Sequence, residues 1–235
     1  MQVHSFVPKF LKNKFIRKKG IKMKKRGLAC LIIGVLITTV MSGCVKIVKV
    51  GEEDSLYASD KFDAVSDVAG IWDSTVLPEL KEKAVDLVEM LTKVNGDLSS
   101  VGEEYGVQDQ GTSSAWNFTV RGTGEVVEIN TESRAGYIEI KLDNYSGSEI
   151  IKLQIGPVFK GTAVRDCSEV IKFENYTNQV DYAAVSKSIH ETITETIIND
   201  LDINSLQGKN IKFIGCFTLD KESELIITPI DIEVQ

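Results

Sequence analysis

Residues 116–129 read WNFTVRGTGEVVEI, and no other stretch constrains the architecture as strongly. From Trp116 to Val120 every second residue is apolar, which is typical of a β-strand with one buried face. Gly122 and Gly124 then interrupt the alternation before a second apolar run begins. Because glycines inside a long strand mark a bulge or a sharp bend, we expect one bent strand that serves two faces of a sheet.

Four shorter strands and one long helix follow the bent strand. Apolar residues spaced by three and four positions predict an amphipathic helix at about residues 179–201. Alternating apolar residues predict two strands before this helix and two after it, and turn residues separate the first two. These strands are expected at residues 138–142, 151–155, 211–218 and 225–234.

The order of these elements narrows the choice of fold. A long bent strand, two strands, a helix and two strands is the order of a five-stranded oligonucleotide/oligosaccharide-binding (OB) barrel, whose helix lies between the third and fourth strands. A bent first strand suits this fold because that strand must cross both halves of the barrel. An open α+β sheet with helices on one face has the same order and stays an alternative.

The chain before the barrel is expected to be helical. A first helix is predicted from an apolar stripe at helical spacing. The stripe consists of Phe62, Val65, Ala69, Trp72 and Val76. Pro78 suits the first turn of a second helix, which ends near Asn95, and residues 97–114 read as a connection. We therefore expect an α+β protein in which an N-terminal helical part, residues 59–96, packs on an OB-like barrel domain, residues 115–235.

An export signal precedes the folded part. Basic residues lead into an apolar run, residues 28–40, and Met-Ser-Gly then stands before Cys44. This order is typical of a lipoprotein signal, residues 1–43, whose removal leaves Cys44 as the lipidated first residue. Met23 is an alternative start, and residues 44–58 read as a polar tether. An uncleaved anchor is the other interpretation, although the apolar run is short of the roughly 20 residues that a spanning helix needs.

The distribution of charge agrees with export. Ten of the 27 basic residues and none of the 34 acidic residues lie in residues 1–43, so the remainder of the chain is strongly acidic. An acidic surface disfavours nucleic acid and anionic lipid as partners. We therefore expect an exported protein, anchored by its lipid to the outer face of the cell membrane or in the periplasm.

Carboxylates are abundant, but no sequence pattern points to catalysis or metal binding. After the signal, His190 is the only histidine, and its place beside the apolar stripe of a helix favours a structural role. Residues 200–204 resemble the start of a calcium loop but lack the glycine and the final glutamate of that loop. The sequence contains no phosphate-binding glycine loop, nucleophile elbow or metal-spaced Cys/His cluster. We expect no cofactor, no metal and no catalytic residue.

Two cysteines remain in the folded part, Cys167 and Cys216. An exported protein can oxidise such a pair, but two cysteines do not make a disulfide framework. The sequence favours two buried, small apolar side chains and leaves a disulfide as the alternative.

Residues 155–166, which read IGPVFKGTAVRD, form the best candidate for a contact segment. Its glycines and proline set specific backbone turns, and Lys160, Thr162, Arg165 and Asp166 offer charges and hydrogen-bonding groups. One interpretation is a loop at the mouth of the barrel that binds a ligand or a partner. The other, which the residues favour, is a structural corner in which Arg165 pairs with a carboxylate and ties the loop to the barrel.

Motifs of this segment and of the barrel recur in one known family. They are Gly156-Pro157, Lys160-Gly161-Thr162-Ala163, Arg165-Asp166, Phe173, Asn178-Gln179, Trp116 to Gly124, Gly208-Lys209 and Ile227-Thr228-Pro229. On these motifs the chain, over essentially all of residues 44–235, resembles a family of predicted periplasmic lipoproteins of unknown function. The resemblance implies an OB-like barrel with a helical part, and genes that often lie beside sugar ABC transporter genes. It carries over no catalytic residue.

Three hypotheses on function follow. The first is a non-enzymatic, lipid-anchored accessory that contacts a sugar ABC transporter or its binding protein. The second is a barrel that itself binds a glycan or another small ligand. The third, an enzyme, would need two carboxylates that face each other across a pocket, as in glycosidases.

Overall fold

The computed structural model of the chain describes residues 62–94, 97–108 and 115–235, all of which belong to one unit, Lys61–Gln235. The predicted signal, the predicted lipidation site Cys44 and the predicted tether lie outside these residues. In the described ranges, no helix is long and apolar enough to cross a membrane.

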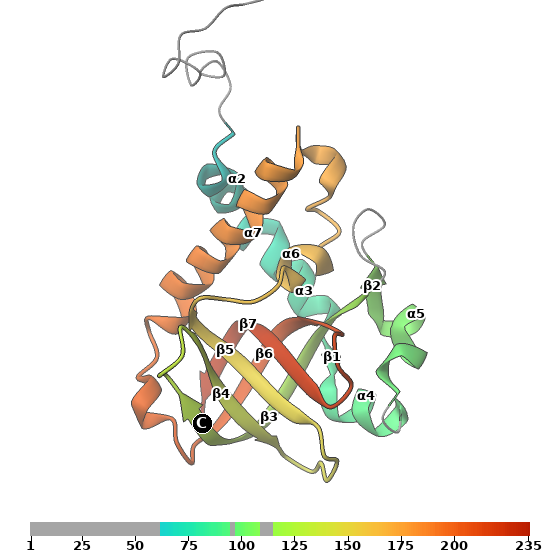
Figure 1. The fold of residues 1–235 in the computed structure, drawn as a ribbon, viewed down its shortest axis with the longest axis vertical. Coiled ribbons are helices and arrows are strands. Elements are labelled where there is room, and N and C mark those ends of the chain that lie inside the picture. Colours follow the sequence, from blue (N-terminus) through green and yellow to red (C-terminus); the bar gives the residue numbers. More distant parts are fainter. Residues whose placement is uncertain (1–61, 95–96, 109–114) are drawn as a thin grey trace, which may run out of the picture. The chain divides into compact units, whose positions relative to one another are not determined.

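Five strands close into a barrel, as Figure 1 shows. They are β3 (Trp116–Asn130), β4 (Ala135–Leu142), β5 (Ile150–Pro157), β6 (Asn210–Thr218) and β7 (Glu224–Val234). The order around the barrel is β3-β4-β5-β7-β6, and β6 pairs again with β3; β5 and β7 are parallel and the other pairs are antiparallel. This closure confirms the predicted OB-like barrel and excludes the open sheet.

The bend in β3 makes the closure possible. One edge of β3 pairs with β6 from Asn117 to Glu125, and the other edge pairs with β4 from Gly124 to Asn130. Strand β4 approaches the bend so closely that a Cβ atom on Gly124 would lie 2.3 Å from the carbonyl oxygen of Lys141. A bulge between Val126 and Glu128 adds to the curvature.

The other edge of the first half of β3 is covered by two short strands that the sequence did not predict. Strand β1 (Val85–Asp86) pairs with Val120 and Arg121, and β2 (Gly106–Gln108) pairs with residues 116–118. Residues 97–108, expected to be a connection, therefore contain η3 (Leu98–Val101), α5 (Gly102–Tyr105) and β2. Pairing with the open edge of β3 orders them, because an exposed edge leaves backbone groups without partners.

The N-terminal helices differ from the prediction in register and continuity. Helix α2 (Ala64–Ile71) passes through a π-helical turn, η2 (Trp72–Val76), into α3 (Leu77–Lys83), and β1 separates α3 from α4 (Leu87–Val94). The buried stripe therefore runs through Val68, Trp72, Val76 and Leu80, each four residues from the next, while Val65 is 61% exposed. The wide π turn keeps this spacing of four on one face. The predicted second helix is broken at Ala84, whose extended backbone leads into β1.

The remaining helices lie between β5 and β6 in the sequence, and α6 and α7, together with α2 and α3, cover one end of the barrel (Figure 1). They are α6 (Ala163–Cys167), η4 (Phe173–Asn175), α7 (Gln179–Ile193), the π turn η5 (Thr194–Ile198) and η6 (Ile203–Ser205). The long helix between the third and fourth barrel strands is thereby confirmed. Asn178 caps α7 by accepting the N–H groups of Val180 and Asp181.

Candidate functional site

Gln154 holds the predicted contact loop against the barrel. Its Nε2 donates to the carbonyl oxygen of Lys160 at 3.1 Å and to Oγ1 of Thr228 at 2.7 Å, and its Oε1 accepts the N–H of Lys160 at 2.6 Å. Positive φ angles at Gly156 and Gly161 let the chain turn back to reach it. Gln154 is consequently only 3% exposed, although strand alternation predicted an outward polar side chain.

Three of the four predicted contact residues form an internal network. Arg165 donates through Nη2 and Nε to one carboxylate oxygen of Asp166, at 2.6 and 2.8 Å, and Thr162 donates to the other oxygen. The guanidinium also stacks on the ring of Tyr182, 3.7 Å from its centroid, and donates to the carbonyl of that residue. Arg165 is 7% exposed, so this part of the segment is a structural corner. It ties α6 to helix α7, whereas the tie to the barrel comes from Gln154.

Lys160, the fourth residue, is exposed and lines a pocket of about 130 Å³ on the outer surface of the barrel. We call the surface around this pocket, formed by β4, β5, the start of β7 and Lys160, the Lys160 face. The pocket is lined by Ser133, Ala135, Gly136, Tyr137, Lys152, Gln154, Lys160, Glu224 and Ile226. Because β4 and β5 are the second and third barrel strands, it lies on the surface that OB folds use to bind ligands.

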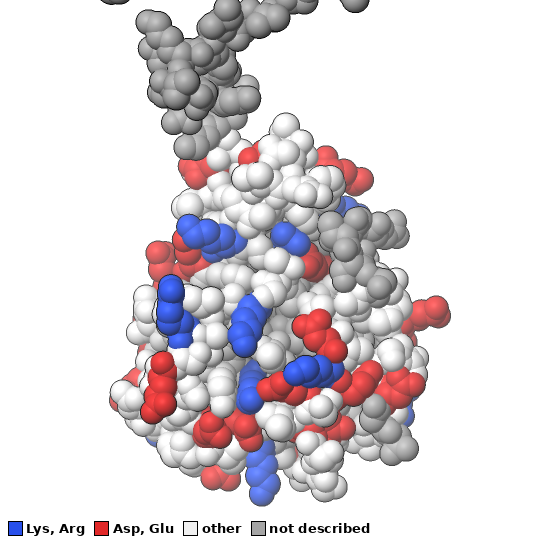
Figure 2. All heavy atoms as spheres, in the orientation of Figure 1, with Lys and Arg blue, Asp and Glu red and all other residues white. Residues whose placement is uncertain are grey.

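The side chains of the Lys160 face are largely paired with one another. Lys152 forms an ion pair of 2.7 Å with Glu224 and lies over the ring of Tyr137, 4.5 Å from its centroid. The hydroxyl of Tyr137 donates to Glu128 at 2.8 Å. The bond to Glu224 raises the pKa of Lys152, so Lys152 stays cationic at neutral pH. Figure 2 shows basic and acidic side chains interspersed over this side of the barrel, a pattern suited to a polar partner.

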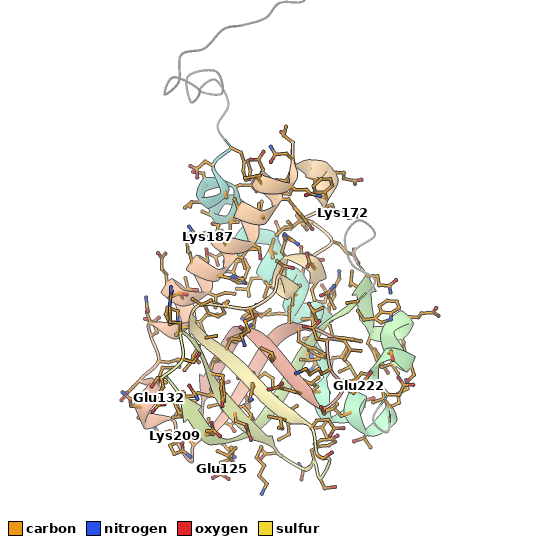
Figure 3. The ribbon with its side chains drawn as sticks, viewed as in Figure 1. Glu125, Glu132, Lys172, Lys187, Lys209 and Glu222 are labelled. Carbon is orange, nitrogen blue, oxygen red and sulfur yellow. The ribbon has the colours of Figure 1, made fainter. Side chains whose placement is uncertain are left out.

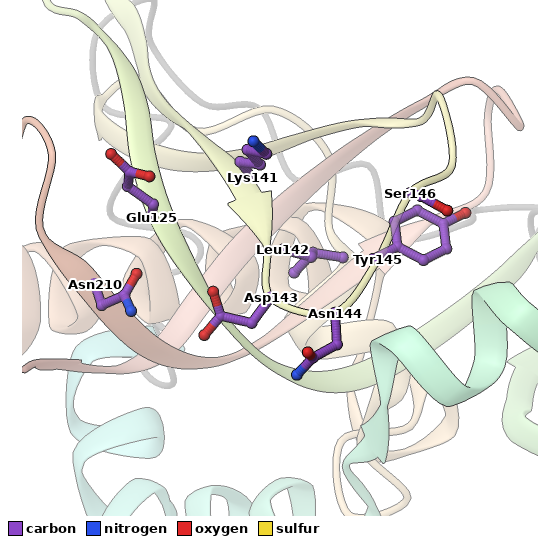
Figure 4. A pocket seen from close by; sticks show the side chains of 8 residues that line it. All are labelled: Glu125, Lys141, Leu142, Asp143, Asn144, Tyr145, Ser146 and Asn210. Atoms are coloured by element: carbon purple, nitrogen blue, oxygen red, sulfur yellow. The ribbon is translucent and has the colours of Figure 1, made fainter.

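A larger hollow of about 490 Å³ lies where the β4–β5 turn meets β3 and β6. Figure 4 shows Glu125, Asp143 and Asn210 around it, with Asn144 on the turn. Lys141, Leu142, Tyr145 and Ser146 complete the lining. We call it the polar hollow. In Figure 3, Glu125 lies beside Lys209 at the end of the barrel farthest from Lys187 on α7.

The polar hollow differs from the Lys160 face because five of its polar side chains have no partner among the described residues. Within the described part of the chain, the side chains of Glu125, Lys141, Asp143, Asn144 and Asn210 make no hydrogen bond or ion pair. They offer both donors and acceptors, as a polyhydroxylated ligand requires. Glu125 is exposed and Asp143 is half-buried, so neither carboxylate lies in an enclosed apolar pocket.

The residues considered as metal ligands or as acid–base groups lie in surroundings that indicate a structural role. His190 stacks on Phe159, with ring centroids 5.1 Å apart, and burial lowers its pKa. Among the described residues, no group of three or more His, Cys, Asp or Glu side chains is arranged to hold a metal ion. Cys167 and Cys216 are both buried and carry free thiols.

Sequence reasoning missed most residues that line the two pockets. Tyr137, Lys152 and Glu224 come from three strands, and the polar hollow joins Glu125 to Asn210 across 85 positions of sequence. The sequence did contain one signal for these residues. The polar positions that alternate with apolar ones along each strand mark Lys141 and Lys152 as surface residues. This signal could not show which strands are neighbours.

The chain matches one protein family in sequence, and its fold is similar to that of a solved structure. Residues 34–233 match the family described as "Predicted periplasmic lipoprotein (DUF2291)". The crystal structure of an OB-fold protein from Thermotoga maritima aligns with a TM-score of 0.58 and 18% identity, over 75% of this chain and all of that one. This likeness shows the fold alone. No curated protein matches the chain.

The family match covers most of the chain and fits the predicted export signal. The protein is accordingly exported and associated with the membrane through a lipid, and Cys44 stays the predicted site of that lipid. This chain belongs to the family of predicted periplasmic lipoproteins, with an OB-fold barrel as its folded part.

Proposed function

We propose that this lipoprotein is a non-enzymatic accessory of a sugar ABC transport system, and that it contacts the transporter or its binding protein through the Lys160 face. The proposal rests on three supports. The family places the protein where such transporters work. The resemblance implies neighbouring sugar ABC transporter genes. The Lys160 face is an accessible surface at the position that OB folds use for binding.

The size of the pocket is the observation that favours a protein partner over an enclosed solute. Ligand pockets that bury a small molecule usually measure about 300–1,000 Å³. The pocket beside Lys160 has a volume of about 130 Å³. A surface of this kind suits a shallow contact in which a partner's side chain fills the pocket and the surrounding charges set orientation.

Cross-linking in membranes tests the partner. Cells that express the full chain at its native level are treated with a short amine-reactive cross-linker, and the products are identified by mass spectrometry. We expect components of a sugar ABC transporter among the cross-linked products. Replicates with efficient cross-linking but no such components would refute it.

A second candidate, a stand-alone glycan-binding module, is favoured by the polar hollow. Its volume of about 490 Å³ falls within the ligand range, and five of its polar side chains lack partners in the described residues. A thermal-shift screen with mono- and oligosaccharides tests this, because a ligand at 100 times its dissociation constant stabilises the folded state by about 2.7 kcal/mol. The shift should vanish in Asp143→Ala and persist in Glu195→Ala, an exposed carboxylate on η5.

A catalytic role is the weakest of the three hypotheses. Glu125 and Asp143 both line the polar hollow, as a glycosidase pair would, but neither is desolvated. We therefore propose that the protein has no enzymatic activity. Release of reducing sugar from glycans by the wild type, lost in Asp143→Asn, would refute this.

A further inference from the structure

Another hollow, of about 240 Å³, lies on the barrel surface where β1, β3, β6 and β7 run side by side. We call it the Arg121 pocket. It is lined by Asp86, Arg121, Gly122, Thr123, Lys212, Phe213, Ile214, Asp231 and Glu233. No residue of β4 or β5, the strands of the Lys160 face, belongs to this lining, so the Arg121 pocket is separate from that face.

Arg121 is the charged residue of this pocket that lacks a partner. Its exposed side chain makes no hydrogen bond or ion pair with the rest of the described chain. The three carboxylates of the lining, in contrast, all have partners. These are the N–H group of Glu89, 2.9 Å from Asp86, and the ammonium groups of Lys81, 2.6 Å from Asp231, and of Lys212, 3.9 Å from Glu233. Because a guanidinium presents its N–H donors in a fork that matches a carboxylate, the free charge of the pocket suits a carboxylate from outside the chain.

The Arg121 pocket continues into the polar hollow along the β3–β6 pair. Every second residue of a strand faces the same side, and the pairing of β3 with β6 has no shift of register from Asn117 to Glu125. The outward pairs are Arg121 with Ile214, Thr123 with Lys212 and Glu125 with Asn210. The first two pairs line the Arg121 pocket, and the third lines the polar hollow (Figure 4). The two hollows are therefore neighbours on one surface, and the step from Arg121 to Glu125 spans about 13 Å of strand.

We propose that the Arg121 pocket binds the carboxylate of an acidic sugar unit whose uncharged neighbouring units lie in the polar hollow. The assignment rests on the second candidate function, the glycan-binding module, and specifies its ligand as a short glycan with one carboxylate. Arg121 receives that carboxylate. The hydroxyl of Thr123 and the ammonium of Lys212, which is only loosely paired, line the same pocket as further donors. The free donors and acceptors of the polar hollow take the hydroxyl groups of the neighbouring units.

The size and charge of the site limit the ligand. A volume of about 240 Å³ is below the roughly 300 Å³ at which pockets for drug-sized molecules begin, so the Arg121 pocket suits a single small unit of a longer ligand. The chain after the predicted signal is strongly acidic and repels a polyanion. One carboxylate on an otherwise neutral glycan avoids this repulsion and meets the free guanidinium.

Isothermal titration calorimetry of the full chain in detergent measures the preference for a carboxylate. The ligands are two matched pairs: sialyllactose with lactose, and aldotriouronic acid, which is a glucuronate joined to xylose units, with xylotriose. We expect an acidic member to bind about tenfold more tightly than its neutral counterpart, because hydrogen bonds between charged groups are stronger than neutral ones. Equal affinities within both pairs would overturn the assignment and leave the glycan-binding module standing.

Two variants locate the preference. Arg121→Gln should lower the affinity for the acidic ligand to that for its neutral counterpart. Arg134→Gln, which changes another exposed arginine without a side-chain partner in the described ranges, should keep the preference. A preference for the acidic ligand that survives Arg121→Gln, with the variant shown to be folded by its urea midpoint, would overturn the assignment. Failure of all four ligands to bind would also overturn it, and the screen with Asp143→Ala then decides separately on the module.

Discussion

Replacing Gln154 by methionine should destabilise the protein far more than the same replacement at a surface glutamine. Gln154 makes three hydrogen bonds, two to the backbone of Lys160 and one to Thr228. Methionine keeps the volume of the side chain and removes all three bonds. Gln207→Met is the matched control, because the exposed Gln207 makes one hydrogen bond, to the carbonyl of Val127.

The expected loss of unfolding free energy depends on what happens to the groups that lose their hydrogen bonds to Gln154. Each lost hydrogen bond costs a net of about 0.5–1.5 kcal/mol, and a buried group left without a partner costs about 1–3 kcal/mol. Lys160 is exposed, so its backbone groups can bind water, whereas Thr228 is only 1% exposed. Together these effects predict a loss of about 2–4 kcal/mol for Gln154→Met, against less than about 1 kcal/mol for Gln207→Met.

Urea unfolding followed by tryptophan fluorescence measures both variants, since Trp72 is buried and Trp116 is half-buried. Trypsin cleavage after Lys160 supplies a local measurement, because the loop should open more often without its clamp. Equal losses of stability in the two variants, together with unchanged cleavage after Lys160, would refute the role of Gln154.

Three further outcomes are expected. Gly124→Ala should lose about 1–3 kcal/mol in urea unfolding, since its Cβ would meet the carbonyl oxygen of Lys141, while Gly70→Ala, with open space around it, should not lose stability; similar results for both would contradict the close approach. Burial lowers the pKa of His190, so protons bind more readily to the unfolded chain and stability falls as pH drops from about 7 to about 5.5. His190→Gln should remove that component, and urea midpoints that change in parallel in wild type and variant would exclude it. Cys44→Ala should accumulate an unprocessed precursor without lipid, visible as a larger mass, and normal maturation would exclude lipidation at this residue.

The barrel strands could be read from the sequence because the burial of each is largely local. Alternation at residues 138–142 and 151–155 placed β4 and β5, and the glycines at 122 and 124 located the bend in β3. These signals hold because one face of each strand packs into the barrel core.

The remaining features depend on contacts between distant segments. Strands β1 and β2 are two and three residues long, and they exist because β3 offers a free edge. The π turns at Trp72–Val76 and Thr194–Ile198 shift which residues are buried, and packing against neighbours sets that shift. Arg165 was expected to pair with a carboxylate, but only the fold shows that α7 supplies its stacking partner, Tyr182.

Site-specific photo-cross-linking in membranes can show whether the Lys160 face contacts a transporter. A photoreactive amino acid is introduced at Lys160, and in a matched variant at Lys209, an exposed lysine beside the polar hollow. We expect a cross-link from position 160 to a component of a sugar ABC transporter and none from position 209. Transporter products from position 209 alone, or from neither position while both variants are exported and folded, would contradict a contact through the Lys160 face.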